Sequence, residues 1–116
     1  MTVPFKVSIG WDPREVIAYD VAKRSLQKHA SGVVGIEPIK INELIDVGIY
    51  KRPIDPLAST EFTYTRFFTP YLAGYEGWAL FCDCDFLFFD DILKLQKFQD
   101  PAKAVLCVKH MYNPQE

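Results

Sequence analysis

Two aspartates are the residues in this sequence whose type and spacing first point to chemistry. Asp83 and Asp85 close an apolar run, residues 78–84, of the kind that forms a buried strand. On extended chain such a pair points to one side, with Cα atoms about 6.5 Å apart. Carboxylates that close repel each other unless a cation lies near them, and hard oxygen ligands select Mn²⁺ or Mg²⁺. The pair therefore predicts a divalent metal site, although two solvated aspartates at a strand end would show the same pattern.

The cysteines predict no competing metal site. Cys82 and Cys84 could supply half of a zinc site, but no second Cys/His pair follows at ligand spacing. Together with Cys107 they make an odd count without the spacing of a disulfide framework. We expect Cys82 and Cys84 to be free thiols in a buried strand.

The surrounding pattern predicts an α/β sheet. Residues 5–9 alternate as a strand, Asp12 and the following proline predict a helix start, and residues 33–39 predict a second strand. This order begins a mainly parallel sheet with helices on both faces. Residues 78–84 should be its central strand, with the aspartates at the carboxyl end, where ligands gather in open sheets. Residues 104–108 predict a further strand.

Two helical faces are predicted from apolar spacing. The first helix should bury one face, made of Ala18, Val21, Ala22, Ser25, Leu26 and His29. A second helix should start near Thr60 and bury a stripe of Tyr64, Phe67, Phe68 and Tyr71. Arg66 lies off that stripe, and Pro70 should kink or end the helix.

The connecting segments carry weaker signals. Residues 41–57 predict a long loop, because Pro53 and Pro56 exclude a long helix. Asp90 or Asp91 should cap a short helix.

Composition narrows the possible partners and compartments. The formal net charge is −2, and no Lys/Arg cluster suggests nucleic-acid binding. No apolar run reaches the roughly 20 residues of a bilayer span, and no secretory signal opens the chain. We expect a cytoplasmic protein that can self-associate through exposed apolar surface.

Three segments together resemble the GT-A glycosyltransferases, in particular the family-8-like group of glycogenin and bacterial galactosyltransferases. Trp78-Ala-Leu-Phe-Cys-Asp-Cys-Asp85 and the residues up to 95 are similar to the metal-binding segment. Residues 59–67 resemble the upstream helix that supplies an arginine, and residues 8–15 resemble the first strand and turn, which hold the nucleotide base.

The resemblance implies a Rossmann-like GT-A fold, a nucleotide-sugar donor (UDP-sugar above all) and a divalent cation, usually manganese. Asp85 would bind the metal, and Asp83 would contact the ribose or sugar and share the metal. Arg66 would contact the diphosphate or donor sugar. The base pocket would be lined by Gly10, Trp11 and Asp12.

One departure from the family pattern concerns the third metal ligand. That ligand is usually a histidine in the second half of the domain, and the surroundings of His110 do not match it. We therefore expect residues 1–116 to be the N-terminal, nucleotide-sugar-binding part of a single GT-A domain, without its acceptor-side half. The predicted function is hexosyl transfer to an unknown saccharide, lipid or protein. The alternatives are a non-catalytic nucleotide-sugar-binding fragment that needs a partner segment, and a haloacid-dehalogenase-like phosphatase.

Overall fold

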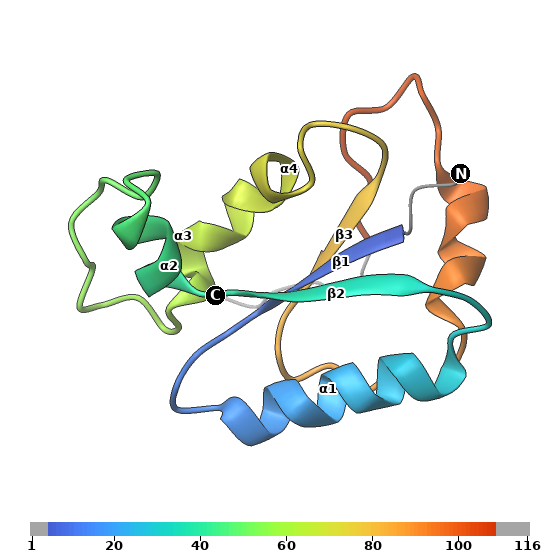
Figure 1. The fold of residues 1–116 in the computed structure, drawn as a ribbon, viewed down its shortest axis with the longest axis horizontal. Coiled ribbons are helices and arrows are strands. Elements are labelled where there is room, and N and C mark those ends of the chain that lie inside the picture. The colour runs from blue at the N-terminus through green and yellow to red at the C-terminus, as the bar shows by residue number, and fades with distance from the viewer. Residues whose placement is uncertain (1–4, 109–116) are drawn as a thin grey trace, which may run out of the picture.

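A computed structural model describes residues 5–108 of the chain as a small α/β unit (Figure 1). In chain order its elements are β1 (Phe5–Gly10), α1 (Val16–His29), β2 (Val34–Ile39), α2 (Ile41–Asp46), α3 (Phe62–Thr65), the 3₁₀ helix η1 (Arg66–Phe68), α4 (Thr69–Leu72), β3 (Ala79–Cys82) and the 3₁₀ helix η2 (Ile92–Phe98).

The three strands form a parallel sheet in the order β2-β1-β3. Helix α1 covers one face, while α2 and the segment from α3 to α4 lie on the other (Figure 1). The predicted α/β class, with a parallel sheet between helices, is therefore confirmed. Three strands are too little of a sheet to establish the GT-A fold.

The prediction that residues 78–84 form the central strand is wrong. The centre of the sheet is β1, whose Val7 and Ile9 are almost completely buried, and within residues 5–108 β3 pairs only with β1. The apolar character of β3 comes from cover over its faces, not from two neighbouring strands. Phe81 packs against Phe62 on the side of α3, and Cys82 belongs to the core beneath α1.

Helix α1 packs on the sheet through a face that differs in part from the predicted one. Its buried residues are Tyr19, Ala22 and Leu26, whereas Val21 is about half exposed. The helix begins at Val16, several residues after the predicted cap Asp12, and Glu15 precedes it without a side-chain cap. The sequence pattern missed Tyr19 because its ring is apolar enough for the core although its hydroxyl is polar.

The segment after β2 also departs from the expected loop. Residues Ile41–Asp46 form α2, which buries Ile41 and Leu44 at a spacing of three. Together with Ile39 and Tyr50 they make a second apolar cluster, against which Tyr64 packs. The two prolines exclude helix only further along, so a six-residue helix before them is compatible with the sequence.

The predicted second helix is divided into α3, η1 and α4, with the 3₁₀ turn just before Pro70, as the kink prediction required. Its predicted apolar stripe is only partly buried, since the side chain of Phe67 is 76% exposed. The change of helical pitch in η1 rotates the later residues. Thr65 and Thr69 are buried instead, and their hydroxyls bond to the carbonyl oxygens of Glu61 and Arg66.

The last described elements contain one confirmed and one wrong prediction. Asp91 caps η2 by accepting a hydrogen bond from the Leu93 N–H at 3.0 Å. Residues 104–108 form no strand, and their side chains are exposed. A β-prone run becomes a strand only when another strand pairs with it, and the described part of the sheet supplies no such pairing for this run.

Candidate functional site

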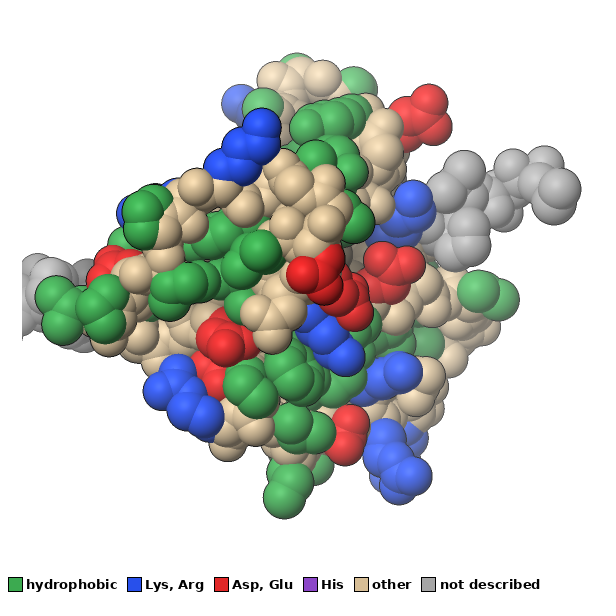
Figure 2. Space-filling view, turned by 60° about the vertical axis from the view of Figure 1, so that its left-hand side comes forward, with side chains coloured by type: hydrophobic (Ala, Val, Ile, Leu, Met, Phe, Trp, Pro, Cys, Tyr) green, Lys and Arg blue, Asp and Glu red, His purple; other side chains and the backbone are tan. Residues whose placement is uncertain are grey.

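The sheet topology brings the candidate residues to one edge. Ile9 of β1 lies beside Cys82 of the parallel strand β3, so the loops that follow the two strands leave the sheet side by side. Asp12 lies in the first loop, and Asp83 and Asp85 lie in the second. Figure 2 shows that acidic and basic side chains meet on this side of the molecule, among apolar ones. This carboxyl edge is the candidate site.

The aspartate pair is arranged differently from the prediction. Strand β3 ends at Cys82, and Cys84 and Asp85 already form a turn, so the pair does not lie on extended chain. Asp83 is half-buried and Asp85 is exposed, while Cys84 between them is buried. The turn follows because Cys84 packs into the core that α1 covers. Both carboxylates remain accessible to solvent.

Arg66 reaches the aspartate pair across the sheet edge. Its Nη2 lies 3.7 Å from Asp83 Oδ1, and the two side chains are 36% and 44% exposed. Its Nε donates a hydrogen bond of 3.2 Å to the carbonyl oxygen of Phe62, one helical turn back. Its ion-pair partner is thus Asp83 and not Glu61, which precedes α3 on the same segment. The structure therefore places Arg66 beside Asp83.

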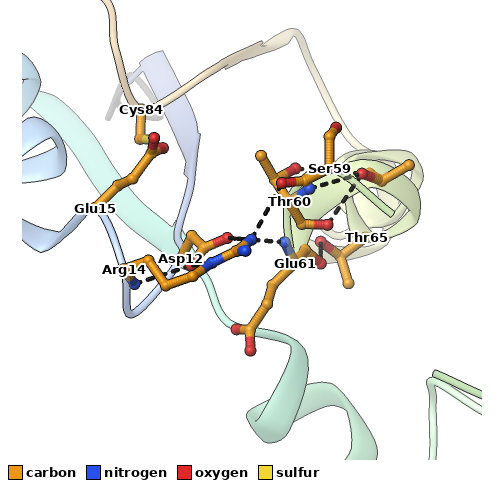
Figure 3. A network of polar contacts seen from close by, with 9 residues as sticks. Asp12, Arg14, Glu15, Ser59, Thr60, Glu61, Thr65 and Cys84 are labelled. Atoms are coloured by element: carbon orange, nitrogen blue, oxygen red, sulfur yellow. Dashed lines mark hydrogen bonds and ion pairs between the residues drawn. The ribbon is translucent and has the colours of Figure 1, made fainter. Parts of the chain in front are cut away.

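Asp12 forms the densest hydrogen-bond network at this edge (Figure 3). Its carboxylate is 1% exposed and accepts four hydrogen bonds. Three come from Arg14: the N–H at 2.9 Å, Nε at 3.0 Å and Nη2 at 2.7 Å. The fourth comes from the Glu61 N–H at 3.2 Å. Because Arg14 Nη2 also donates to the carbonyl oxygen of Ser59 at 3.1 Å, the turn after β1 is bonded twice to the segment that starts α3.

These contacts change the acid–base properties of two carboxyl groups. Hydrogen bonding to the Arg14 guanidinium lowers the pKa of Asp12 to about 2, although burial opposes the shift. Burial raises the pKa of Glu61, and the nearby Asp12 charge adds to that increase. Asp12 therefore remains ionised far into the acid range.

An Asp12→Asn variant should lose stability in a pH-dependent way. The folded-state pKa of Asp12 is about 2 and its ordinary value is 3.8, so its contribution is fully present above pH 4 and disappears as the pH falls through 2. Allowing for the exposed Arg14 partner, we expect the variant to lose about 1–2 kcal/mol at pH 7. Urea unfolding between pH 7 and pH 2.5 should show this difference shrinking toward acid. A constant difference would mean that ionisation of Asp12 does not stabilise the fold.

Gly10 and Trp11, which the sequence placed with Asp12 in a base pocket, both contact protein groups. The Phe62 ring packs directly over Gly10, so closely that a Cβ there would lie 2.5 Å from a ring carbon. The Trp11 ring is covered by the Lys40 ammonium group, 4.7 Å from the ring centroid. The described structure thus shows Gly10 and Trp11 in packing roles.

The two thiols near the site, those of Cys82 and Cys84, are free and buried. Burial raises the pKa of Cys82 and of Cys84 to about 12. Cys84 Sγ donates a hydrogen bond to Glu15 Oε2 at 3.1 Å, which adds to its shift. Thiols with such pKa values keep their protons at neutral pH, so they are poor nucleophiles. This agrees with the prediction of free, buried cysteines.

Sequence reasoning missed the roles of Arg14 and Ser59. Arg14 follows Asp12 and a proline, a pattern that is also typical of helix starts and therefore predicts a helix there. Ser59 contributes only its backbone carbonyl, which no sequence pattern reports. The sequence did offer one signal for this contact: Asp12 and Arg14 carry opposite charges and lie two residues apart, with a proline between them.

Two kinds of feature are absent from the described part of the chain. Among residues 5–108, no group of three or more His, Cys, Asp or Glu side chains is gathered to hold a metal ion. In the same range, no helix has the length and apolarity to cross a membrane. His110 lies outside the described residues.

The chain is similar over most of its length to a curated plant protein. Protein CDI of Arabidopsis thaliana is 46% identical over 113 residues, which are 97% of this chain and 44% of the relative. The chain thus spans less than half the length of the relative that it matches. No family model matches the sequence. No solved structure matches it either.

These comparisons correct the functional prediction. The relative is named Protein CDI and not a glycosyltransferase, and no glycosyltransferase family is indicated. The resemblance to the GT-A, family-8-like enzymes and the predicted sugar transfer are therefore wrong. The nucleotide-sugar roles given to Gly10, Trp11 and Asp12, and the alternative of a nucleotide-sugar-binding fragment, lose the resemblance on which they rested. Three short segments with common residue types, among them Asp-x-Asp, were too little sequence to establish a family.

Proposed function

We propose that the carboxyl edge of the sheet binds a divalent cation, Mn²⁺ or Mg²⁺, through Asp83 and Asp85. The observation that carries the proposal is the placement of both carboxylates: accessible, two residues apart, and just beyond the end of β3. In parallel α/β sheets this edge is where ligands bind. The Rossmann-like arrangement of the unit is part of the proposal, and its support is the parallel order β2-β1-β3.

The number and type of ligands favour these two cations. Mg²⁺ keeps several of its waters and is commonly held by one or two carboxylates, so a third protein ligand is not required. Cys82 and Cys84 are buried, so the accessible ligands that the aspartate pair offers are carboxylate oxygens.

The position of Arg66 indicates which kind of ligand would bind beside the cation. Its guanidinium lies beside Asp83 and is partly exposed, so it can also face a ligand. A cation and a guanidinium side by side favour an anionic, oxygen-rich ligand, since each donates to or coordinates such oxygens. The cation would polarise an oxygen of that ligand, and this is the enzymatic role that we propose for the edge.

The cytoplasmic location, the absence of a nucleic-acid partner and self-association stay predictions.

Calorimetric titration with Mn²⁺ tests the cation site. We expect saturable binding to the wild-type chain and at least about tenfold weaker binding to Asp85→Asn, because one of two carboxylates is lost, a change of about 1.4 kcal/mol. Asp83→Asn should weaken binding similarly. The matched control is Asp20→Asn, which removes an exposed carboxylate from α1, and its affinity should equal that of the wild type. Equal affinity in all four proteins would rule out the site.

A further inference from the structure

Two contacts fix the first turn of α3 against the end of β1. The Glu61 N–H, just before the helix, is bonded to Asp12. The Phe62 ring, in the first turn, packs over Gly10. One contact is polar and the other is steric; the first starts from Asp12, just after β1, and the second from Gly10, the last residue of β1. The start of α3 therefore cannot shift relative to β1 without breaking one of them.

Arg66 depends on this attachment. It lies one turn after Phe62, and its Nε is bonded to the Phe62 carbonyl oxygen at 3.2 Å. The guanidinium is also near the faces of Phe62 and Phe81, at 5.8 Å and 5.2 Å from the ring centroids. A shift of the first turn would thus carry the guanidinium away from Asp83, because the helix and the arginine move together.

We propose that Asp12 is a positioning residue for the cation site: its bond to the Glu61 N–H holds the α3–η1 segment so that Arg66 faces Asp83. This inference rests on the proposed function. Asp12 contacts neither the proposed cation nor the aspartate pair, and it acts through one turn of helix. The bonds from Arg14 keep its carboxylate ionised and aimed at Glu61.

The sign of the effect follows from charge. Held at 3.7 Å from Asp83, the positive guanidinium competes with a bare divalent cation for that carboxylate. Arg66→Gln should therefore bind Mn²⁺ about three- to tenfold more tightly than the wild type. Asp12→Asn loosens the attachment, so it should tighten Mn²⁺ binding about two- to threefold.

A double-mutant cycle separates positioning from general loosening of the fold. In the Arg66→Gln background, Asp12→Asn should no longer change Mn²⁺ affinity, since the group it positions is gone. Asp91→Asn is the control: it removes a carboxylate that also accepts a backbone N–H, but on η2. It should leave the affinity unchanged in both backgrounds. An unchanged affinity in Asp12→Asn, or an effect that persists with Arg66→Gln, overturns the inference while leaving the cation site intact.

A metal-free measurement covers the case in which the wild type binds no Mn²⁺, which would refute the proposed function alone. The NMR resonance of the Arg66 Nε–H reports its bond to the Phe62 carbonyl and its distance from Asp83. It should shift in Asp12→Asn in the same direction as in Asp83→Asn, and it should not shift in Asp91→Asn. A resonance unmoved by Asp12→Asn overturns the positioning role whatever the metal does.

Discussion

A Gly10→Ala variant is expected to unfold with a free energy about 1–3 kcal/mol below that of the wild type, which is the usual cost of forcing an extra carbon into a packed site. The new Cβ would lie 2.5, 2.6 and 2.7 Å from three carbons of the Phe62 ring, distances that no real contact tolerates. Either the ring or the strand must move, and the start of α3 moves with the ring. Urea unfolding followed by circular dichroism measures the loss.

Gly35 offers a matched control for this experiment. It lies in the adjacent parallel strand β2, and a Cβ there would have its nearest neighbours at an ordinary 3.9 Å. Gly35→Ala should therefore leave stability within about 0.5 kcal/mol of the wild type or raise it slightly, because alanine restricts the unfolded chain. If both variants lose stability equally, the close packing of Phe62 over Gly10 is not the reason why alanine is unfavourable at position 10.

A Leu26→Ala variant should lose about 2–5 kcal/mol, because it leaves a cavity in the core between α1 and the sheet. Leu26 is 0% exposed and belongs to the cluster that contains Val7 and Ile9 of the central strand. For a unit of this size such a loss is a large part of the whole stability. Thermal and urea unfolding should both show it.

The same helix provides the comparison. Ile17 is 80% exposed. Ile17→Ala truncates a large side chain as Leu26→Ala does, but at an exposed position it should change stability by no more than about 0.5 kcal/mol. The contrast tests which face of α1 meets the sheet. A large loss of stability at Ile17 together with a small one at Leu26 would mean that the opposite face of α1 packs on the sheet.

Strands β1 and β2 and the first helix were predictable because their signals are local, whereas the β-prone run 104–108 forms no strand. Alternation in residues 5–9 and the apolar spacing around Ala22 and Leu26 depend only on neighbours in sequence. The order of the strands was not predictable in this way. Residues 78–84 are apolar because helices cover both faces, and a sequence does not distinguish that cover from a second neighbouring strand.

The candidate site was predictable in its members but not in its bonds. Asp83 and Asp85 were predicted from type and spacing, and Arg66 from the family resemblance; the structure brings Arg66 to Asp83. The turn at Cys84 was missed because packing of its side chain, not backbone propensity, bends the chain there. The network of Asp12 was missed because two of its contacts use only the backbone of residues 59 and 61.

The Asp12 network also sets how freely each of its positions can vary. Position 61 contributes only its N–H, so any residue except proline can serve there, whatever its side chain. Position 14 is far more restricted, because Nε and Nη2 contact the two oxygens of one carboxylate as a fork, and the single ammonium group of lysine cannot reproduce that geometry. Among homologous chains that retain the carboxyl edge of the sheet, Asp12 and Arg14 should therefore be replaced together or not at all, while the residue at position 61 varies freely.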